Sequence, residues 1–112
     1  MADKKGLINW SQFLENSGTH HNYKDQLIAQ LEKDLGITFS SLKGSVIFSE
    51  SHALVQKKAE NQTLGELLYR IDLGEGKAQN CMQAESPIEC LTKAILQREA
   101  QKVFFRIQYS SP

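Results

Sequence analysis

The residues that come nearest to acid–base chemistry by type and spacing are Arg70, Asp72, Arg98 and Glu99. A carboxylate can transfer protons while a neighbouring guanidinium holds an anionic group. Neither pair has a histidine or a catalytic nucleophile beside it in the sequence. We therefore interpret the four residues as structural ion pairs between two helices, which fix how those helices lie against each other. No catalytic residue is predicted, and the chain is not expected to be an enzyme.

A second charged pattern is a basic ridge, because Arg98, Lys102 and Arg106 recur every four residues. Such a ridge on a helix can follow the phosphates of a nucleic acid. The chain has 13 basic and 13 acidic residues and no net charge, whereas proteins that bind nucleic acids or membrane surfaces usually carry a basic excess. Residues 60–85 are acidic and could neutralise the ridge within the chain. A nucleic-acid-associated or regulatory protein is therefore the alternative hypothesis.

The soft metal ligands of the chain are His20, His21, His52, Cys81 and Cys90. Zinc sites favour close pairs such as Cys-x-x-Cys, or two histidines four residues apart on a helix, and neither spacing occurs. We therefore expect no metal and no cofactor. A disulfide between the two cysteines could form in geometry, but a domain of 112 residues does not need one. Reduced thiols are the simpler expectation.

The N-terminal sequence predicts a cytoplasmic location. Lys4 and Lys5 are not followed by the seven or more consecutive apolar residues that a secretory signal needs. No apolar run approaches the roughly eighteen residues of a membrane-spanning helix. Together with reduced cysteines, these features predict a cytoplasmic protein that has no membrane partner.

The elements that must position these side chains are expected to be helices. Capping patterns, in which a short polar residue is followed three positions later by Glu or Gln, occur at 9–12, 63–66 and 86–89. The last has Pro87 at the first helical position as well. These patterns place helix starts near residues 10, 64 and 87.

Hydrophobic spacing adds the remaining helices. Apolar residues recur every four positions over 23–35, and Gly36 is expected to end that helix. The helix that starts near residue 64 is expected to end at Gly74, and residues 78–82 to form one short turn. A helix is also expected over 53–60.

Two short segments leave alternatives open. Residues 45–48 form a β-prone run that could be a short strand or the start of the helix over 53–60. Residues 102–109 alternate apolar and polar side chains like a strand, yet no Gly, Pro or Asn separates them from the helix that starts at Pro87. We predict a mainly α fold over 1–112, a single domain of four or five helices with a long last helix. The alternative is an α+β fold with a strand at 102–109.

Two stretches, LLYRIDL at 67–73 and LTKAILQREAQKVFFR at 91–106, carry a family resemblance. The chain resembles a group of small uncharacterised bacterial proteins that pair a "YRID" helix with a C-terminal helix containing "RExQKV". The resemblance covers roughly the last fifty residues. It implies that residues 60–108 are helical and act as a unit, and it implies no activity.

The last helix is predicted to carry two apolar stripes. The first lies in its N-terminal half, and the second comprises Leu96, Ala100, Val103, Phe104 and Ile107. The other predicted helices each supply one apolar face, so the second stripe lacks an obvious cover within the chain. A large uncovered apolar surface on a small chain is typical of an interface. We therefore predict a non-enzymatic intracellular interaction protein that forms a homodimer through this stripe.

Overall fold

Five helices build the part of the chain that the computed structural model describes, which is residues 21–110. They are α3 (His21–Leu35), α4 (Gly44–Glu60), α5 (Leu64–Ile71), α6 (Glu75–Met82) and α7 (Pro87–Ser110). No strand occurs within this range. The predicted mainly α fold is therefore confirmed, and the alternative with a strand at 102–109 is wrong because α7 continues to Ser110. The predicted helix start near residue 10 lies outside the described residues.

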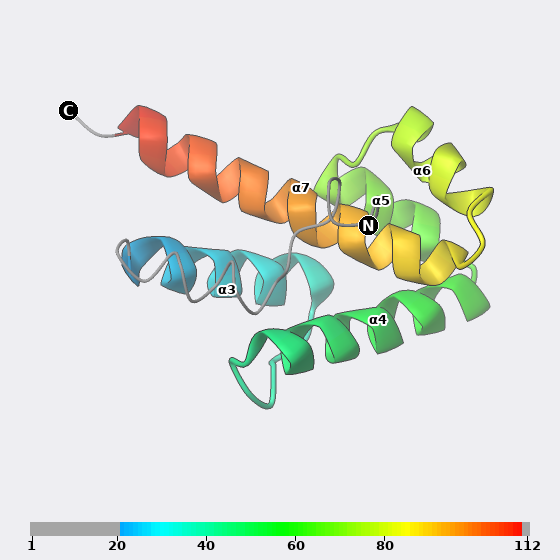
Figure 1. Cartoon of the computed structure of the whole chain (residues 1–112), viewed down its shortest axis with the longest axis horizontal. Helices are drawn as coiled ribbons and strands as arrows, with labels where there is room; N and C mark the ends of the chain where they lie inside the picture. The colour runs from blue at the N-terminus through cyan, green and yellow to red at the C-terminus, as the bar shows by residue number, and fades with distance from the viewer. Residues whose placement is uncertain (1–20, 111–112) are drawn as a thin grey trace.

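The long helix α7 is the centre of the structure, and each of the other four helices packs against it. Figure 1 shows α3 and α4 along one side of α7, and α5 and α6 near its N-terminal half. Helix α3 begins beside the C-terminal end of α7, so the two helices run in opposite directions. Helix α5 also contacts α3 and α4, which closes the group around the middle of α7.

The core lies where α3, α4 and α5 meet α7. The predicted four-residue spacing of α3 is borne out, because its apolar side chains are buried there. The fully buried large apolar residues are Leu27, Leu31, Ile47, Val55, Leu67, Ile71, Leu91, Ile95, Leu96 and Val103. Helix α6 contributes none of these large side chains and adds only Cys81 to the buried core.

Residues 45–48 lie in α4 and not in a strand, which decides one of the open alternatives. Ile47, Ser51 and Val55 are fully buried and are four residues apart, so one helical stripe faces the core. The β-prone composition of the run is overridden by this burial, which continues over the whole of α4. The spacing from Ile47 to Val55 was the sequence signal for a helix.

The prediction that Gly36 and Gly74 each end a helix is right for Gly36 and wrong for Gly74. Gly36 takes a left-handed conformation (φ 72°), and its N–H donates to the carbonyl of Glu32, so it ends α3 as predicted. Helix α5 ends earlier than expected, at Ile71, because Asp72 takes the left-handed conformation (φ 63°). Gly74 (φ 97°) stands instead at the start of α6. The expected short turn at 78–82 belongs to this helix.

The cysteines differ from the expectation of reduced thiols, because Cys81 of α6 and Cys90 of α7 form a disulfide. Residues 83–86 connect the two helices so tightly that the two Cα atoms lie 5.3 Å apart, within the range of disulfides in proteins. The expectation used the size of the domain and ignored how closely a short connection brings the two helices together.

Candidate functional site

The expected ion pair between the two predicted helices is made by Arg98 and Asp72. Arg98 donates from Nε to the backbone carbonyl of Asp72 (3.0 Å) and from Nη2 to its carboxylate (3.2 Å). Its Nη1 donates to the side chain of Gln101 at 3.2 Å. The guanidinium of α7 thus binds the residue that ends α5.

Lys102 binds the same end of α5. Its ammonium donates to the backbone carbonyl of Ile71 at 2.8 Å. The last carbonyls of a helix have no partner inside the helix and carry partial negative charge, so cations are favourable there. Arg98 and Lys102 together therefore cap α5, which is only 8 residues long and has little stability of its own.

Arg70 acts in the same way on a different helix and does not contact Glu99 as one reading of the sequence allowed. Its Nη1 donates to the backbone carbonyl of Asp34, near the end of α3, at 2.9 Å. The four predicted residues therefore do not form one cluster. Arg98 and Asp72 meet at the end of α5, Arg70 binds the end of α3, and Glu99 pairs with Lys102. Nothing in the sequence indicated Asp34 as the partner, because it lies 36 residues from Arg70.

Arg106, the third member of the predicted basic ridge, donates from Nη2 to the side chain of Gln30 on α3. All three basic residues of the ridge therefore donate to acceptors within the chain. A cation that binds a phosphate must give up or share such donors. The ridge serves to hold α3 and α5 against α7.

Glu99 and Asp34 are the buried acidic groups at this junction, and Glu99 has no exposed surface. The Lys102 ammonium lies 2.9 Å from Oε2, in an ion pair that is not aligned as a hydrogen bond. The Asp34 carboxylate lies 3.7 Å from the same ammonium. Burial raises the pKa of Glu99 to about 7, with Asp34 raising it further and Lys102 lowering it.

A raised carboxyl pKa is typical of catalytic acids, but a catalytic acid must touch its substrate. Two cavities flank α7, of about 500 Å³ and about 220 Å³, and Glu99 lines neither. Among residues 21–110 no three His, Cys, Asp or Glu residues come close enough together to hold a metal ion. The junction is best understood as structural.

The predicted interface stripe is largely inside the molecule. Leu96, Ala100 and Val103 are at most 3% exposed, and Ile107 is half-buried against the core. The phenol of Tyr23 on α3 donates to the carbonyl of Ala100 at 3.1 Å, and burial raises the pKa of Tyr23 to about 12, so the phenol keeps its proton. The expectation that the stripe lacks an obvious cover within the chain is wrong for Leu96, Ala100 and Val103, because they are buried in the core and α3 bonds to Ala100.

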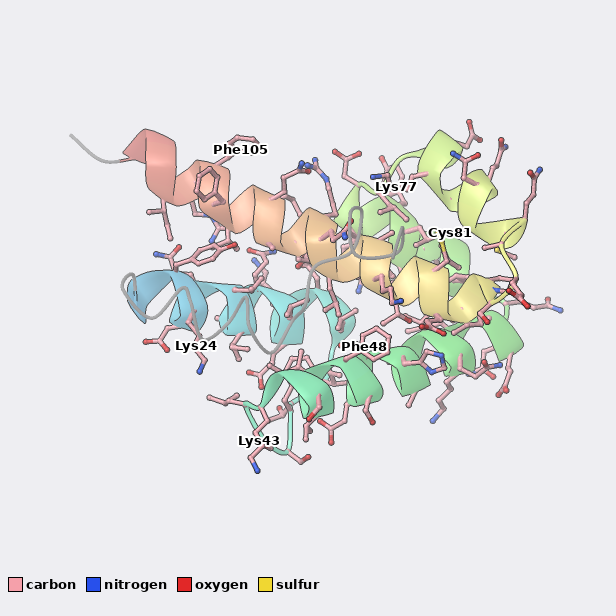
Figure 2. The ribbon with its side chains drawn as sticks, in the orientation of Figure 1. Lys24, Lys43, Phe48, Lys77, Cys81 and Phe105 are labelled. Atoms are coloured by element: carbon pink, nitrogen blue, oxygen red, sulfur yellow. A yellow bond between two sulfur atoms is a disulfide. The ribbon has the colours of Figure 1, made fainter. Side chains whose placement is uncertain are left out.

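Phe104 is the member of the stripe that stays at the surface, with 50% of its area exposed. Phe105 is 44% exposed, and the two rings meet edge to face with centroids 5.8 Å apart. Phe104 also packs against Tyr23, with centroids 6.5 Å apart. Figure 2 shows Phe105 on the C-terminal turns of α7.

No family model, curated protein or solved structure matches the chain. The resemblance to the "YRID" group therefore stays a prediction. None of the helices in the described range is both long enough and apolar enough to cross a membrane.

The capping role of Arg98 leads to a prediction. Arg98→Met keeps most of the aliphatic stem and removes the donors to Asp72, so it should lower the free energy of unfolding by about 1 kcal/mol in urea denaturation. Asp72→Asn keeps the backbone carbonyl and tolerates the left-handed conformation. Because the Asp72 side chain is 80% exposed, this variant should stay close to wild type. Equal losses of unfolding free energy in Arg98→Met and Asp72→Asn would mean that the side-chain ion pair stabilises the fold and the contact with the backbone carbonyl does not.

Proposed function

We propose that the protein is a non-enzymatic interaction module that pairs with a second copy of itself through the C-terminal turns of α7. The observation that carries the proposal is the adjacent pair Phe104 and Phe105, each about half exposed on one helix surface. A cytoplasmic location stays part of the proposal, although the disulfide removes the reduced cysteines that supported it.

The surface around the two rings supports a symmetric contact. Gln101, one turn before Phe105, is exposed and uncharged, and its side chain accepts a hydrogen bond from Arg98. A two-fold axis across this surface would place each aromatic pair against that of the partner. Fully burying an aromatic side chain contributes about 1.5–3 kcal/mol before the entropy of association is subtracted. Because both rings are already half-buried, the four rings of a dimer contribute only about half of this amount each, and we expect a weak dimer with a Kd near the millimolar range.

The alternative of a nucleic-acid partner has less support. Arg98 and Lys102 each donate to a backbone carbonyl at the end of α5. Binding phosphates through them would compete with contacts that hold α5 in place. The self-association proposal needs no such rearrangement.

Sedimentation equilibrium from micromolar to millimolar concentrations tests the proposal. The wild-type chain should exceed its monomer mass of 12.6 kDa increasingly as concentration rises, whereas Phe104→Ser/Phe105→Ser should stay monomeric with unchanged helical circular dichroism. Tyr69→Ser is the matched control, because Tyr69 is an aromatic residue on α5 that is 89% exposed. A wild-type chain that remains a monomer throughout, or a control that dissociates as fully as the double variant, would refute self-association through this surface.

A further inference from the structure

Helix α6 stands apart from the rest of the fold. Figure 1 shows it beside the N-terminal half of α7 and away from α3 and α4, and its main contact is with α7. Within α6, Cys81 is the one residue that is buried, at 3% exposed. Ala78 is half-buried, and the remaining side chains of this helix are exposed. Noncovalent burial therefore contributes little to holding α6 in place.

The one buried residue of α6 is also the one that is bonded to α7. Figure 2 shows Cys81 between the two helices, where it forms the disulfide with Cys90. A groove of about 500 Å³ separates the helices, and both cysteines line it together with Ala94. The packing between α6 and α7 is thus incomplete beside the bond.

The chain before α6 turns at Asp72 and Gly74, and Leu73 between them is buried in the core at 7% exposed. Asp72 and Gly74 both have positive φ, at 63° and 97°, and they separate α6 from the capped end of α5. Residues 83–86 join α6 to α7 on the other side. Because the buried Leu73 and the capping contacts from α7 hold the end of α5, α6 can move about Gly74 without disturbing α5.

We propose that the Cys81–Cys90 disulfide is a redox latch, whose reduction releases α6 from α7 while α3, α4, α5 and α7 stay packed. The body of the domain does not depend on α6, because every fully buried large apolar side chain comes from the other four helices. Release uncovers the groove face of α7, including Lys93, Ala94 and Gln97.

A dithiol reductant would open the latch by thiol–disulfide exchange. Its thiolate attacks Cys90, which is half-buried, and the sulfur–sulfur bond breaks to leave Cys81 as a thiolate that takes up a proton. The second thiol of the reductant then attacks the mixed disulfide and releases Cys90. Two electrons and two protons pass to the protein, and the reductant becomes a disulfide. Because reducing compartments keep thiols reduced, the position of α6 would report the redox state around the protein.

Hydrogen exchange read by mass spectrometry tests the latch, with dithiothreitol as the reductant. The mass of the untreated protein after alkylation should show no free thiol at Cys81 or Cys90. On reduction, the amides of α6 should exchange at least about tenfold faster, while those of α3, α4 and the middle of α7 should keep their protection. Two alkylated cysteines before reduction, unchanged exchange in α6, or a loss of protection over the whole domain would each overturn the proposal.

Two variants separate the disulfide from other effects of the reductant. Cys81→Ala/Cys90→Ala should show the fast exchange of α6 both with and without dithiothreitol. Met82→Ser is the matched control, because Met82 lies beside Cys81 in α6 and is 56% exposed. With the disulfide intact, this variant should exchange like the oxidised wild type. Slow exchange of α6 in the double variant would show that the bond does not hold the helix.

Discussion

Replacing Glu99 with glutamine is expected to remove a pH dependence of stability between about pH 4.5 and pH 7. The pKa of Glu99 rises from an ordinary 4.5 to about 7 because the side chain is buried. The folded state therefore holds the proton more tightly than the unfolded state. Stability linked to this group is fully present below about pH 4.5 and is lost as the pH rises through about 7.

The expected size of the effect follows from the same shift. A difference of about 2.5 pH units corresponds to roughly 3 kcal/mol in the free energy of unfolding. Urea denaturation at pH 5 and at pH 8 gives the free energy of unfolding of Glu99→Gln minus that of wild type. This difference should be up to about 3 kcal/mol more favourable to the variant at pH 8 than at pH 5. The glutamine keeps the shape of the side chain and removes the buried charge, while Lys102 stays beside Asp34.

Glu89→Gln is the matched control on the same helix. Glu89 pairs with Lys93 at 3.0 Å, and its side chain is 47% exposed, so solvent screens the pair. This control should change stability by well under 1 kcal/mol at both pH values. The prediction is wrong if the stability of Glu99→Gln relative to wild type changes with pH no more than that of the control. Ionising Glu99 in the folded state would then cost little free energy.

The contacts between α5 and α7 show what the sequence could and could not predict. The acidic residues 60–85 were expected to neutralise the basic ridge of the last helix, and the contact between Asp72 and Arg98 is present. Composition could not show that Arg98 and Lys102 bind backbone carbonyls at the end of α5. Those acceptors exist in every residue and become available only where a helix ends.

The helices were predictable to different degrees. Strong four-residue spacing with a glycine stop predicted α3, and the proline at the first helical position predicted the start of α7. Thr63 stands at the start of α5 as its pattern predicts, but its side chain makes no capping hydrogen bond there and faces the carbonyl of Lys58 instead. Local patterns thus locate helix starts even where the capping contact itself is absent.

The error over the second apolar stripe has a geometric cause. A helix at the centre of a bundle is covered from several directions, so its apolar surface extends around most of its circumference. The sequence alone assigned one covering face to each of the other helices. The structure surrounds α7 with all four, and Leu96, Ala100 and Val103 therefore fall inside the core.

Leu96→Ala provides the sharpest test of that correction. Leu96 is fully buried, so truncating it should remove hydrophobic contacts and leave a cavity, with a loss of about 2–4 kcal/mol in the free energy of unfolding. The loss should appear in dilute protein, where self-association is absent, and it should not change with protein concentration. Urea denaturation over a range of concentrations measures it.

Phe104→Ser is the reciprocal variant on the same helix. Phe104 is 50% exposed, so its truncation should cost about 1 kcal/mol or less of stability in dilute protein. It should instead weaken the association measured by sedimentation, which Leu96→Ala should leave unchanged wherever that variant is folded. The opposite outcome, with Leu96→Ala dissociating a dimer at little cost in stability, would return the second stripe to the interface. In that case Leu96 would lie at the interface between two copies, and not in the core.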